Sequence, residues 1–223
     1  MAGPLRLAVL ASGRGSNLQA ILDAIGDGVL DAEVVGVFSD RPASGAIERA
    51  RRVGVPAVAL RPAEFTDRAD FDAALFDAIA RVQPDIIVCA GYMRLLGAAQ
   101  VEAWHGRMIN IHPSLLPLFK GLRTHEQALA SGALEHGASV HFVTAELDGG
   151  PVLAQARVAV VPSDDTASLA ARVLDREHPL LVSALQLFAA RRVRLDGSSV
   201  MVDGQPLSRP LQLAGTDLAE LPG

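Results

Sequence analysis

Cysteine is almost absent from this chain of 223 residues, and long apolar runs are missing. The single Cys89 excludes an internal disulfide, which favours a reducing compartment such as the cytoplasm. Cys89 lies in the apolar run 86–90, where a thiol is more often a small buried group than a nucleophile. No apolar run approaches the roughly 20 residues of a membrane span. The run 5–10 near the N-terminus is too short for a secretory signal. We therefore expect a soluble cytoplasmic protein.

Lysine is scarce as well, because Lys120 is the only one and arginines supply nearly all the positive charge. The formal net charge is −5 and the sequence pI is about 5.6. A chain with this charge is poorly suited to wide contacts with nucleic acid phosphates or an anionic membrane. We expect small-molecule partners and no nucleic acid, and the sequence leaves a monomer or a homodimer open.

Several familiar motifs are incomplete or missing. The turn 13–17 begins a G-x-G-x-x-G pattern, but Leu18 stands at the third glycine position and no Walker lysine follows. The six histidines show no H-E-x-x-H or close Cys/His spacing, so we expect no metal site. No G-x-S-x-G elbow is present, and Ser114 lies in a stiff loop between Pro113 and Pro117. A Ser-His-Asp hydrolase is therefore disfavoured.

Continuous apolar runs alternate with segments of helical periodicity. This alternation predicts an α/β fold, a single-domain Rossmann-like arrangement with a mostly parallel twisted sheet and helices on both faces. Strands are expected at 5–11, 32–38, 57–60, 85–90, 108–112, 138–144 and 152–161. Thr66 or Asp67 can cap a helix that follows it.

The C-terminal third carries three further signals. A helical run from about Asp165 to Arg191 contains Pro179, which predicts a break or kink just after His178. Asp-Gly turns at 196–197 and 203–204 predict a small hairpin. We expect one domain over 1–205, with halves at about 1–100 and 101–205, and a poorly ordered tail over 206–223.

The first glycine-rich turn joins a strand to a helix. Backbone N–H groups at Gly15, with Ser16 and Asn17 at the helix start, suit one phosphate monoester. A plain tight turn explains the same residues, so this pattern alone leaves both interpretations open.

The motif that carries the chemistry is Asn110–Pro117. In a strand, Asn110 and His112 project from the same face, so an amide donor lies beside an imidazole. Such a pair can stabilise a developing oxyanion in acyl transfer. A structural role for a histidine at a strand end is the commoner alternative.

Asp148 lies in a loop between two predicted strands and precedes Gly149 and Gly150. A carboxylate beside the His112 imidazole would stabilise its protonated form. An aspartate before glycine more often bonds its own turn, and the residues alone do not decide between the two roles.

Four segments in the right order, 13–17, 93–96, 110–117 and 139–151, resemble the folate-dependent formyltransferases over residues 5–195. The motifs are similar to those of the branch that acts on glycinamide ribonucleotide in purine synthesis. The resemblance implies transfer of the formyl group of 10-formyltetrahydrofolate to the amine of N1-(5-phosphoribosyl)glycinamide, a nucleotide-binding N-terminal half, and a folate-binding and catalytic C-terminal half.

The resemblance also implies roles for individual residues. Asn110, His112 and Asp148 would be catalytic. The substrate would contact Gly15, Ser16, Asn17 and Glu177. The folate would contact Arg68, Met93, Arg94, Leu95, Leu96, Asn110, Thr144, Ala145, Glu146, Leu147 and Asp148. One departure is Leu118-Phe119, which stand before Lys120-Gly121 where many relatives place a basic residue at once.

Three alternatives share parts of this pattern. A 10-formyltetrahydrofolate hydrolase would use the same three catalytic residues but carry an extra N-terminal domain, whereas the first strand here begins at Leu5. A methionyl-tRNA formyltransferase would need a C-terminal domain and a basic face. A non-catalytic nucleotide-binding module could use the 13–15 turn with Asp40 on a ribose, but it leaves the catalytic residues without a role.

Overall fold

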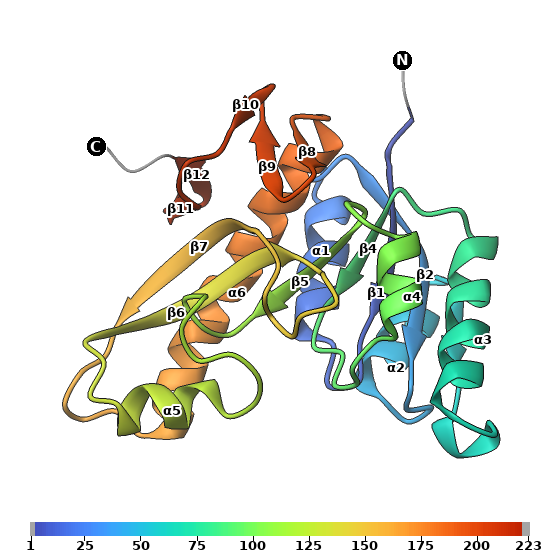
Figure 1. Ribbon diagram of the computed structural model, residues 1–223, viewed down its shortest axis with the longest axis horizontal. Helices are drawn as coiled ribbons and strands as arrows, with labels where there is room; N and C mark the ends of the chain where they lie inside the picture. Colours follow the sequence, from blue (N-terminus) through green and yellow to red (C-terminus); the bar gives the residue numbers. More distant parts are fainter. Residues whose placement is uncertain (1–2, 220–223) are drawn as a thin grey trace. The chain divides into compact units, whose positions relative to one another are not determined.

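The computed structural model describes residues 3–219. Two compact units make up the chain, the first ending at Ile109 and the second beginning at Asn110 (Figure 1). The chain passes from one to the other within strand β5. The first unit contains β1 (Leu5–Leu10), α1 (Ser16–Gly26), β2 (Ala32–Ser39), α2 (Gly45–Arg52), β3 (Ala57–Ala59), a 3-10 turn (Pro62–Glu64), α3 (Arg68–Arg81), β4 (Ile86–Cys89), α4 (Ala98–Ala103) and the start of β5 (Met108–His112). The second contains α5 (Thr124–Ala130), β6 (Glu135–Phe142), β7 (Val152–Ala159), α6 (Thr166–Ala189), β8 (Val193–Asp196), β9 (Ser199–Val202), β10 (Gln205–Pro206), β11 (Leu211–Ala214) and β12 (Asp217–Ala219).

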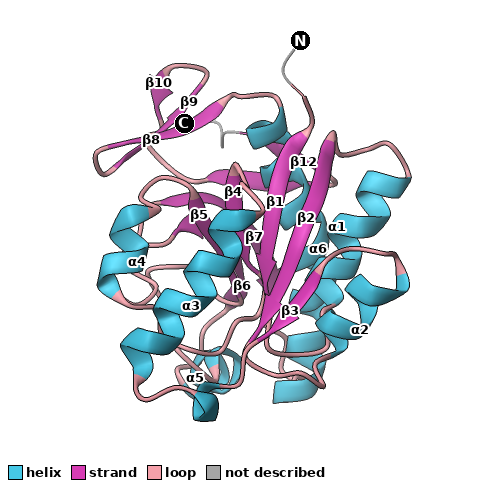
Figure 2. Ribbon diagram, turned by 90° about the vertical axis from the view of Figure 1, so that its right-hand side faces the viewer, coloured by secondary structure: helices cyan, strands magenta, loops and turns pink. Residues whose placement is uncertain are grey.

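The strands of the first unit are parallel, in the order β4-β1-β2-β3. Helices α1 and α2 lie on one face and α3 and α4 on the other (Figure 2). With both faces covered, strand residues are buried whichever way they point, and Leu7, Ala8 and Val9 are all fully buried. Asp67 caps α3 by accepting a hydrogen bond from the Asp70 N–H at 2.9 Å, as predicted. The predicted α/β class with a mostly parallel sheet is confirmed.

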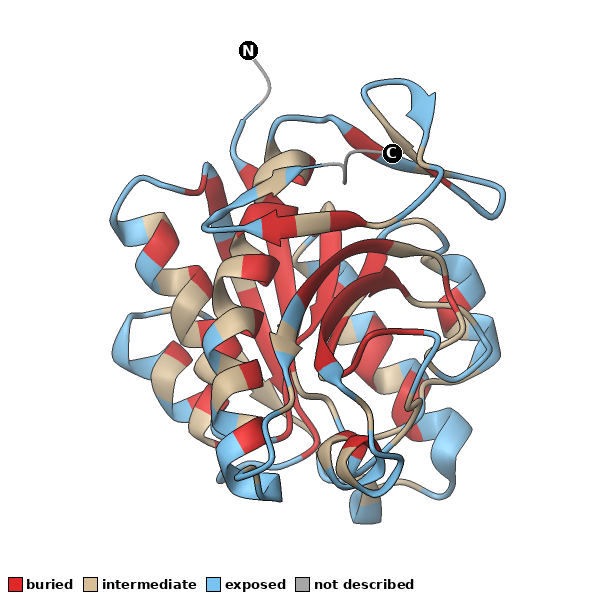
Figure 3. Cartoon of the chain, turned by 90° about the vertical axis from the view of Figure 1, so that its left-hand side faces the viewer, coloured by how far each residue is buried: buried red, intermediate tan, exposed pale blue. Residues whose placement is uncertain are grey.

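The strands of the second unit follow the order β5-β6-β7-β11-β12. Strands β6 and β7 are antiparallel neighbours, and both are largely buried (Figure 3). Helix α6 packs against both of them. The pairing places Ser139 opposite Gln155 and brings His141 beside Val152, so that polar side chains enter an otherwise apolar layer near the end of β6.

Helix α6 continues through Pro179, so the helix does not break after His178, and of the predicted break or kink only the kink stays a prediction. A proline inside a helix costs about 3 kcal/mol because one backbone bond is lost and its ring meets the preceding turn. The next turns bury Leu180, Leu181 and Leu185, each worth about 1.5–3 kcal/mol. The Ser183 hydroxyl also donates to the Pro179 carbonyl at 2.8 Å. Packing therefore outweighs the local preference.

The predicted poorly ordered tail is corrected for residues 206–219. Strand β11 pairs in parallel with β7, with Leu211 opposite Ala154, and β12 pairs antiparallel with β11. Leu211 and Leu213 are buried, and Arg176 donates to the Leu213 carbonyl at 3.3 Å. Two alternating leucines thus extend a sheet edge, a signal too short to stand out in the sequence. The remainder of the predicted tail, residues 220–223, lies outside the described residues.

The predicted hairpin is confirmed, because β8 and β9 pair antiparallel across the turn at Gly197, and β10 adds to β9. Within residues 3–219, no helix is both long and apolar enough to cross a membrane.

Candidate active site

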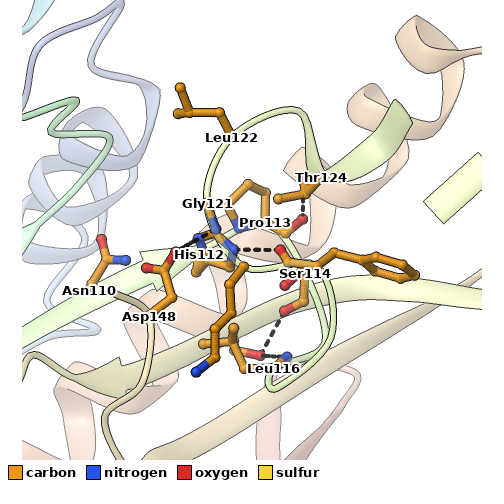
Figure 4. A network of polar contacts seen from close by, with 12 residues as sticks. Asn110, His112, Pro113, Ser114, Leu116, Gly121, Leu122, Thr124 and Asp148 are labelled. Carbon is orange, nitrogen blue, oxygen red and sulfur yellow. Dashed lines mark hydrogen bonds and ion pairs between the residues drawn. The ribbon is translucent and has the colours of Figure 1, made fainter. Parts of the chain in front are cut away.

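Asn110 and His112 lie two positions apart at the end of β5, the spacing that places two side chains on the same face of a strand. His112 is buried and Asn110 is half-buried. Asp148, from the loop between β6 and β7, approaches the same imidazole (Figure 4). The structure therefore brings the three predicted catalytic residues into one part of the second unit.

The His112 imidazole contacts a different group at each ring nitrogen. Nε2 lies 3.1 Å from the Phe119 carbonyl oxygen, and since a carbonyl only accepts, Nε2 carries a proton. Nδ1 lies 3.5 Å from Asp148 Oδ2, and the two side chains are only 7% and 9% exposed. That separation is long for a hydrogen bond. Nδ1 is consequently the nitrogen that gains or donates a proton in this arrangement.

Asp148 is fixed by its backbone as well as its partners. Its φ of +46° places it in the left-handed region, which aspartate adopts more readily than most residues. The Gly121 N–H donates to Asp148 Oδ2 at 2.8 Å, which holds the carboxylate beside the imidazole (Figure 4).

His141 is a site residue that sequence reasoning missed. Its Nδ1 donates to the Phe142 carbonyl at 2.9 Å, and its Nε2 lies 3.1 Å from Asn110 Nδ2. Burial lowers the pKa of His141 to about 4, although the Phe142 carbonyl and Asp148 oppose this shift. The ring is therefore neutral at pH 7, and Nε2 accepts from the Asn110 amide. Its 3.7 Å approach to Asp148 Oδ1 is then not an ion pair.

This contact orients the Asn110 amide. One Nδ2 hydrogen is committed to His141, while the second hydrogen is left for another acceptor. The sequence signal for this role was the presence of Ser139 and His141 two positions apart in the apolar second half of β6.

The loop after β5 is held by a network of buried polar contacts (Figure 4). Ser114 is fully buried, and its hydroxyl donates to the Leu118 carbonyl at 2.6 Å. The Ser139 hydroxyl donates to the Ser114 carbonyl and accepts from the Leu116 N–H, and Gln155 donates to the Leu116 carbonyl. Ser114 thus shapes the loop, and its lack of a nucleophilic role stays a prediction.

A second histidine pair lies beside this loop. His125 Nδ1 and His136 Nε2 are 3.1 Å apart, and the Phe119 ring packs edge-on against His136. Burial lowers the pKa of both rings, that of His136 to about 4. Over residues 3–219, no group of three or more His, Cys, Asp or Glu side chains is arranged to hold a metal ion.

The glycine-rich turn lies in the first unit. Gly15 immediately precedes α1 with a φ of +75°, and a Cβ there would come within 2.8 Å of the Ala46 Cα. Only glycine fits this close approach without strain. Helix α1 begins at Ser16, so the N–H groups of its first turn face outward at the positive end of the helix.

An open cleft of about 550 Å³ adjoins this turn. Arg14, Arg41 and Arg49 line it, together with Ser12, Gly13, Ala43, Ser44 and Gly45. Arg49 donates to the Arg14 carbonyl at 3.0 Å and to Gln19 at 2.7 Å, which braces the turn. Sequence reasoning missed these arginines because they come from three separate segments of the chain.

The remaining predicted residues divide between the units. In the first, the Met93 N–H donates to Ser12 Oγ at 2.9 Å, while the Met93 and Leu95 side chains are exposed. Arg94 lies 5.1 Å from the centre of the Phe71 ring. Arg68 approaches the buried Asp72 at 3.4 Å.

In the second unit, the predicted folate loop carries an exposed Leu147 and a Glu146 that pairs with Lys120. Thr144 opens this loop, and its hydroxyl donates to the Glu146 carbonyl at 3.4 Å. Glu177 is buried on α6.

Comparison with known proteins decides the family. The sequence model described as formyl transferase matches residues 5–185. The chain belongs to the formyl transferase family. It is 44% identical over 203 residues to the phosphoribosylglycinamide formyltransferase of Escherichia coli K12, covering 91% of this chain and 96% of that protein. It is 41% identical to the trifunctional purine biosynthetic protein adenosine-3 of Bos taurus, over 85% of this chain and 19% of that protein.

Solved structures agree with this membership. The phosphoribosylglycinamide formyltransferase of Coxiella burnetii superposes with a TM-score of 0.89 and 46% identity, covering 92% of this chain and 96% of that one. The resemblance inferred from the sequence motifs is confirmed, and this family member is a formyltransferase enzyme.

Proposed function

We propose that the protein transfers the formyl group of 10-formyltetrahydrofolate to the terminal amine of N1-(5-phosphoribosyl)glycinamide, a step of purine biosynthesis. Membership of the family and the high coverage of relatives named for this activity support the substrate assignment. The observation that carries the chemistry is the buried arrangement of His112 between the Asp148 carboxylate and the Phe119 carbonyl.

In the proposed reaction, the substrate amine attacks the formyl carbon. A new C–N bond forms, the bond between the formyl carbon and folate N10 breaks, and the proton released by the amine ends on N10. Charge develops on the formyl oxygen before the second bond breaks. The free Nδ2 hydrogen of Asn110 and the protonated Nδ1 of His112 stabilise this oxyanion, and no covalent enzyme intermediate is needed.

Two acceptors flank the His112 imidazole. The Phe119 carbonyl accepts from Nε2, and the Asp148 carboxylate faces Nδ1. Because Asp148 Oδ2 is already held by the Gly121 N–H, the carboxylate stays in place while His112 donates. Asp148 also orients the water that moves protons between the two nitrogens.

Binding is assigned unit by unit. In the first unit, Gly15, Ser16 and Asn17 would bind the substrate phosphate at the start of α1, with the cationic cleft alongside. The folate would contact Arg68 and the exposed segment 93–96. In the second unit, the loop 144–148 would contact the folate, and Glu177 the ribose or glycinamide part. We place the enzyme in the cytoplasm, as a monomer or homodimer that needs no metal.

The test measures tetrahydrofolate release from 10-formyltetrahydrofolate with and without glycinamide ribonucleotide. We expect release only with the ribonucleotide, and a loss of about 10²–10³ in kcat for Asn110→Ala and Asp148→Asn. His112→Ala should be inactive, whereas the exposed His105→Ala serves as the matched control. Release without the ribonucleotide would identify the hydrolase instead. Normal turnover in the Asn110 and Asp148 variants would remove both from the mechanism.

A further inference from the structure

Lys120 is the only lysine of the chain, and it stands in the segment 119–121 beside the active site. Three consecutive residues of this segment each make one contact in the site region. The Phe119 carbonyl accepts from His112, and the Lys120 ammonium lies 2.7 Å from Glu146 Oε1. The Gly121 N–H donates to Asp148. The two backbone contacts therefore depend on where this segment is held.

The segment does not hold itself in place. Phe119 has a φ of +53°, in the left-handed region that is unfavourable for a side chain of this size. The residues that flank the segment bury little apolar surface, since Leu118 is 54% exposed and Leu122 is 72% exposed. The Leu122 side chain points away from His112 (Figure 4). External contacts must therefore maintain the conformation.

Besides the Ser114 hydroxyl on the Leu118 carbonyl, contacts come from two directions. Gln127 donates to the Leu122 carbonyl at 2.7 Å, and the Phe119 ring packs against His136, which ties the segment to α5 and β6. The Lys120–Glu146 ion pair and the Gly121–Asp148 bond tie it to the loop 144–150. Hydrogen bonding by Lys120 lowers the pKa of the Glu146 carboxyl, which favours the charged carboxylate in this pair.

Gly149 makes room for the Glu146 carboxylate. A Cβ at position 149 would lie 2.3 Å from Glu146 Cδ and 2.6 Å from Oε2, and all three of its nearest contacts belong to the Glu146 side chain. The Gly149 backbone is not in the left-handed region. An alanine there would displace the carboxylate from Lys120 while leaving both charges in the chain.

We propose that Lys120 and Glu146 are positioning residues for formyl transfer, an inference that rests on the proposed function. Their ion pair keeps the segment 119–121 against the loop 144–150. It thereby keeps the Phe119 carbonyl on His112 Nε2 and the Gly121 N–H on Asp148. These contacts leave His112 Nδ1 as the proton-donating nitrogen.

The first experiment measures kcat and KM for Lys120→Met, Glu146→Gln and the exchanged pair Lys120→Glu with Glu146→Lys. An exposed ion pair changes the ratio of closed to open segment by up to about fivefold, so we expect kcat to fall in each single variant, by up to about fivefold. The KM for the ribonucleotide should not change, and the exchanged pair should recover at least half of the loss. Wild-type kcat in the single variants, or no recovery in the exchange, would overturn the proposal.

A matched control is the Arg157–Glu135 pair, which is as close, at 2.8 Å, and about as exposed. Arg157→Gln and Glu135→Gln should stay within about twofold of wild type. An equal fall in these controls would show that loss of any exposed ion pair lowers kcat, which also overturns the proposal.

The second experiment does not depend on activity. A lysine-specific endoproteinase can cut this chain only after Lys120, so the cleavage rate reports how often the segment opens. Glu146→Gln and Gly149→Ala should be cut about three- to fivefold faster than wild type, and Glu135→Gln at the wild-type rate. Unchanged cleavage in the first two variants would refute the positioning role. If wild type transfers no formyl group but cleavage follows this pattern, the proposed function fails while the role of the ion pair in holding the segment stands.

Discussion

Acidification should destabilise the protein through His141. The ring is neutral in the folded state because burial lowers its pKa to about 4, whereas an exposed histidine in the unfolded chain has a pKa near 6.5. The unfolded chain therefore binds more protons between these values, and stability falls as the pH drops from about 6.5 toward 4. With these two values, the linkage relation gives a loss of about 2 kcal/mol between pH 7 and pH 5 from His141 alone.

Urea unfolding at pH 7 and pH 5 measures this loss for wild type and His141→Gln. A glutamine retains polar atoms near Asn110 but does not titrate, so the variant should lose about 2 kcal/mol less than wild type over the same pH interval. His136 contributes a similar loss to both proteins, because its pKa is also lowered to about 4 by burial. The exposed His105→Gln should behave like wild type. Equal losses in wild type and His141→Gln would refute the assignment of a neutral, buried His141.

Three further outcomes follow from the site. Arg41→Gln should raise the KM for the ribonucleotide several-fold at low salt with little change in kcat. Arg52→Gln is the control and should leave this KM unchanged, because Arg52 lies on the same helix as the cleft residue Arg49 but pairs with Glu48. Gly15→Ala should weaken inorganic phosphate binding and lower the unfolding midpoint, because its φ is +75° and its Cβ would meet α2. Ser114→Ala should keep the transfer reaction within about tenfold, since a loss of about 10⁴ or more is typical of a catalytic nucleophile. Thermal shift and steady-state kinetics decide each case.

The parts of the fold that the sequence predicted are those set by local pattern. Apolar runs buried on both faces gave the parallel strands, and the i, i+2 spacing of Asn110 and His112 put both on one side of β5. Asp67 was recognisable as a helix cap because capping depends on the next three residues only. The role of Asp148 was implied only by the resemblance of its loop to the family motif, because that role depends on its distance from His112. The structure supplies this distance.

The errors arose where tertiary packing overrides local preference. Pro179 breaks an isolated helix, but here the leucines that follow it are buried against β6 and β7. The alternating apolar pattern at Leu211 and Leu213 is short, yet the segment adds to a strand that is already in place and needs only these two residues. Neither compensation is visible in a sequence window, because the strands against which these leucines are buried lie tens of positions away.

Backbone groups make two further contacts that sequence reasoning missed. The Phe119 carbonyl selects which nitrogen of His112 carries a fixed proton, and the Gly121 N–H fixes the carboxylate of Asp148. Neither contact depends on side-chain identity, so no motif records them. They depend on the conformation of a loop whose own side chains bury little apolar surface. The side chains that maintain such a loop therefore affect catalysis without contacting the substrate, and in this chain the charged candidate is its single lysine.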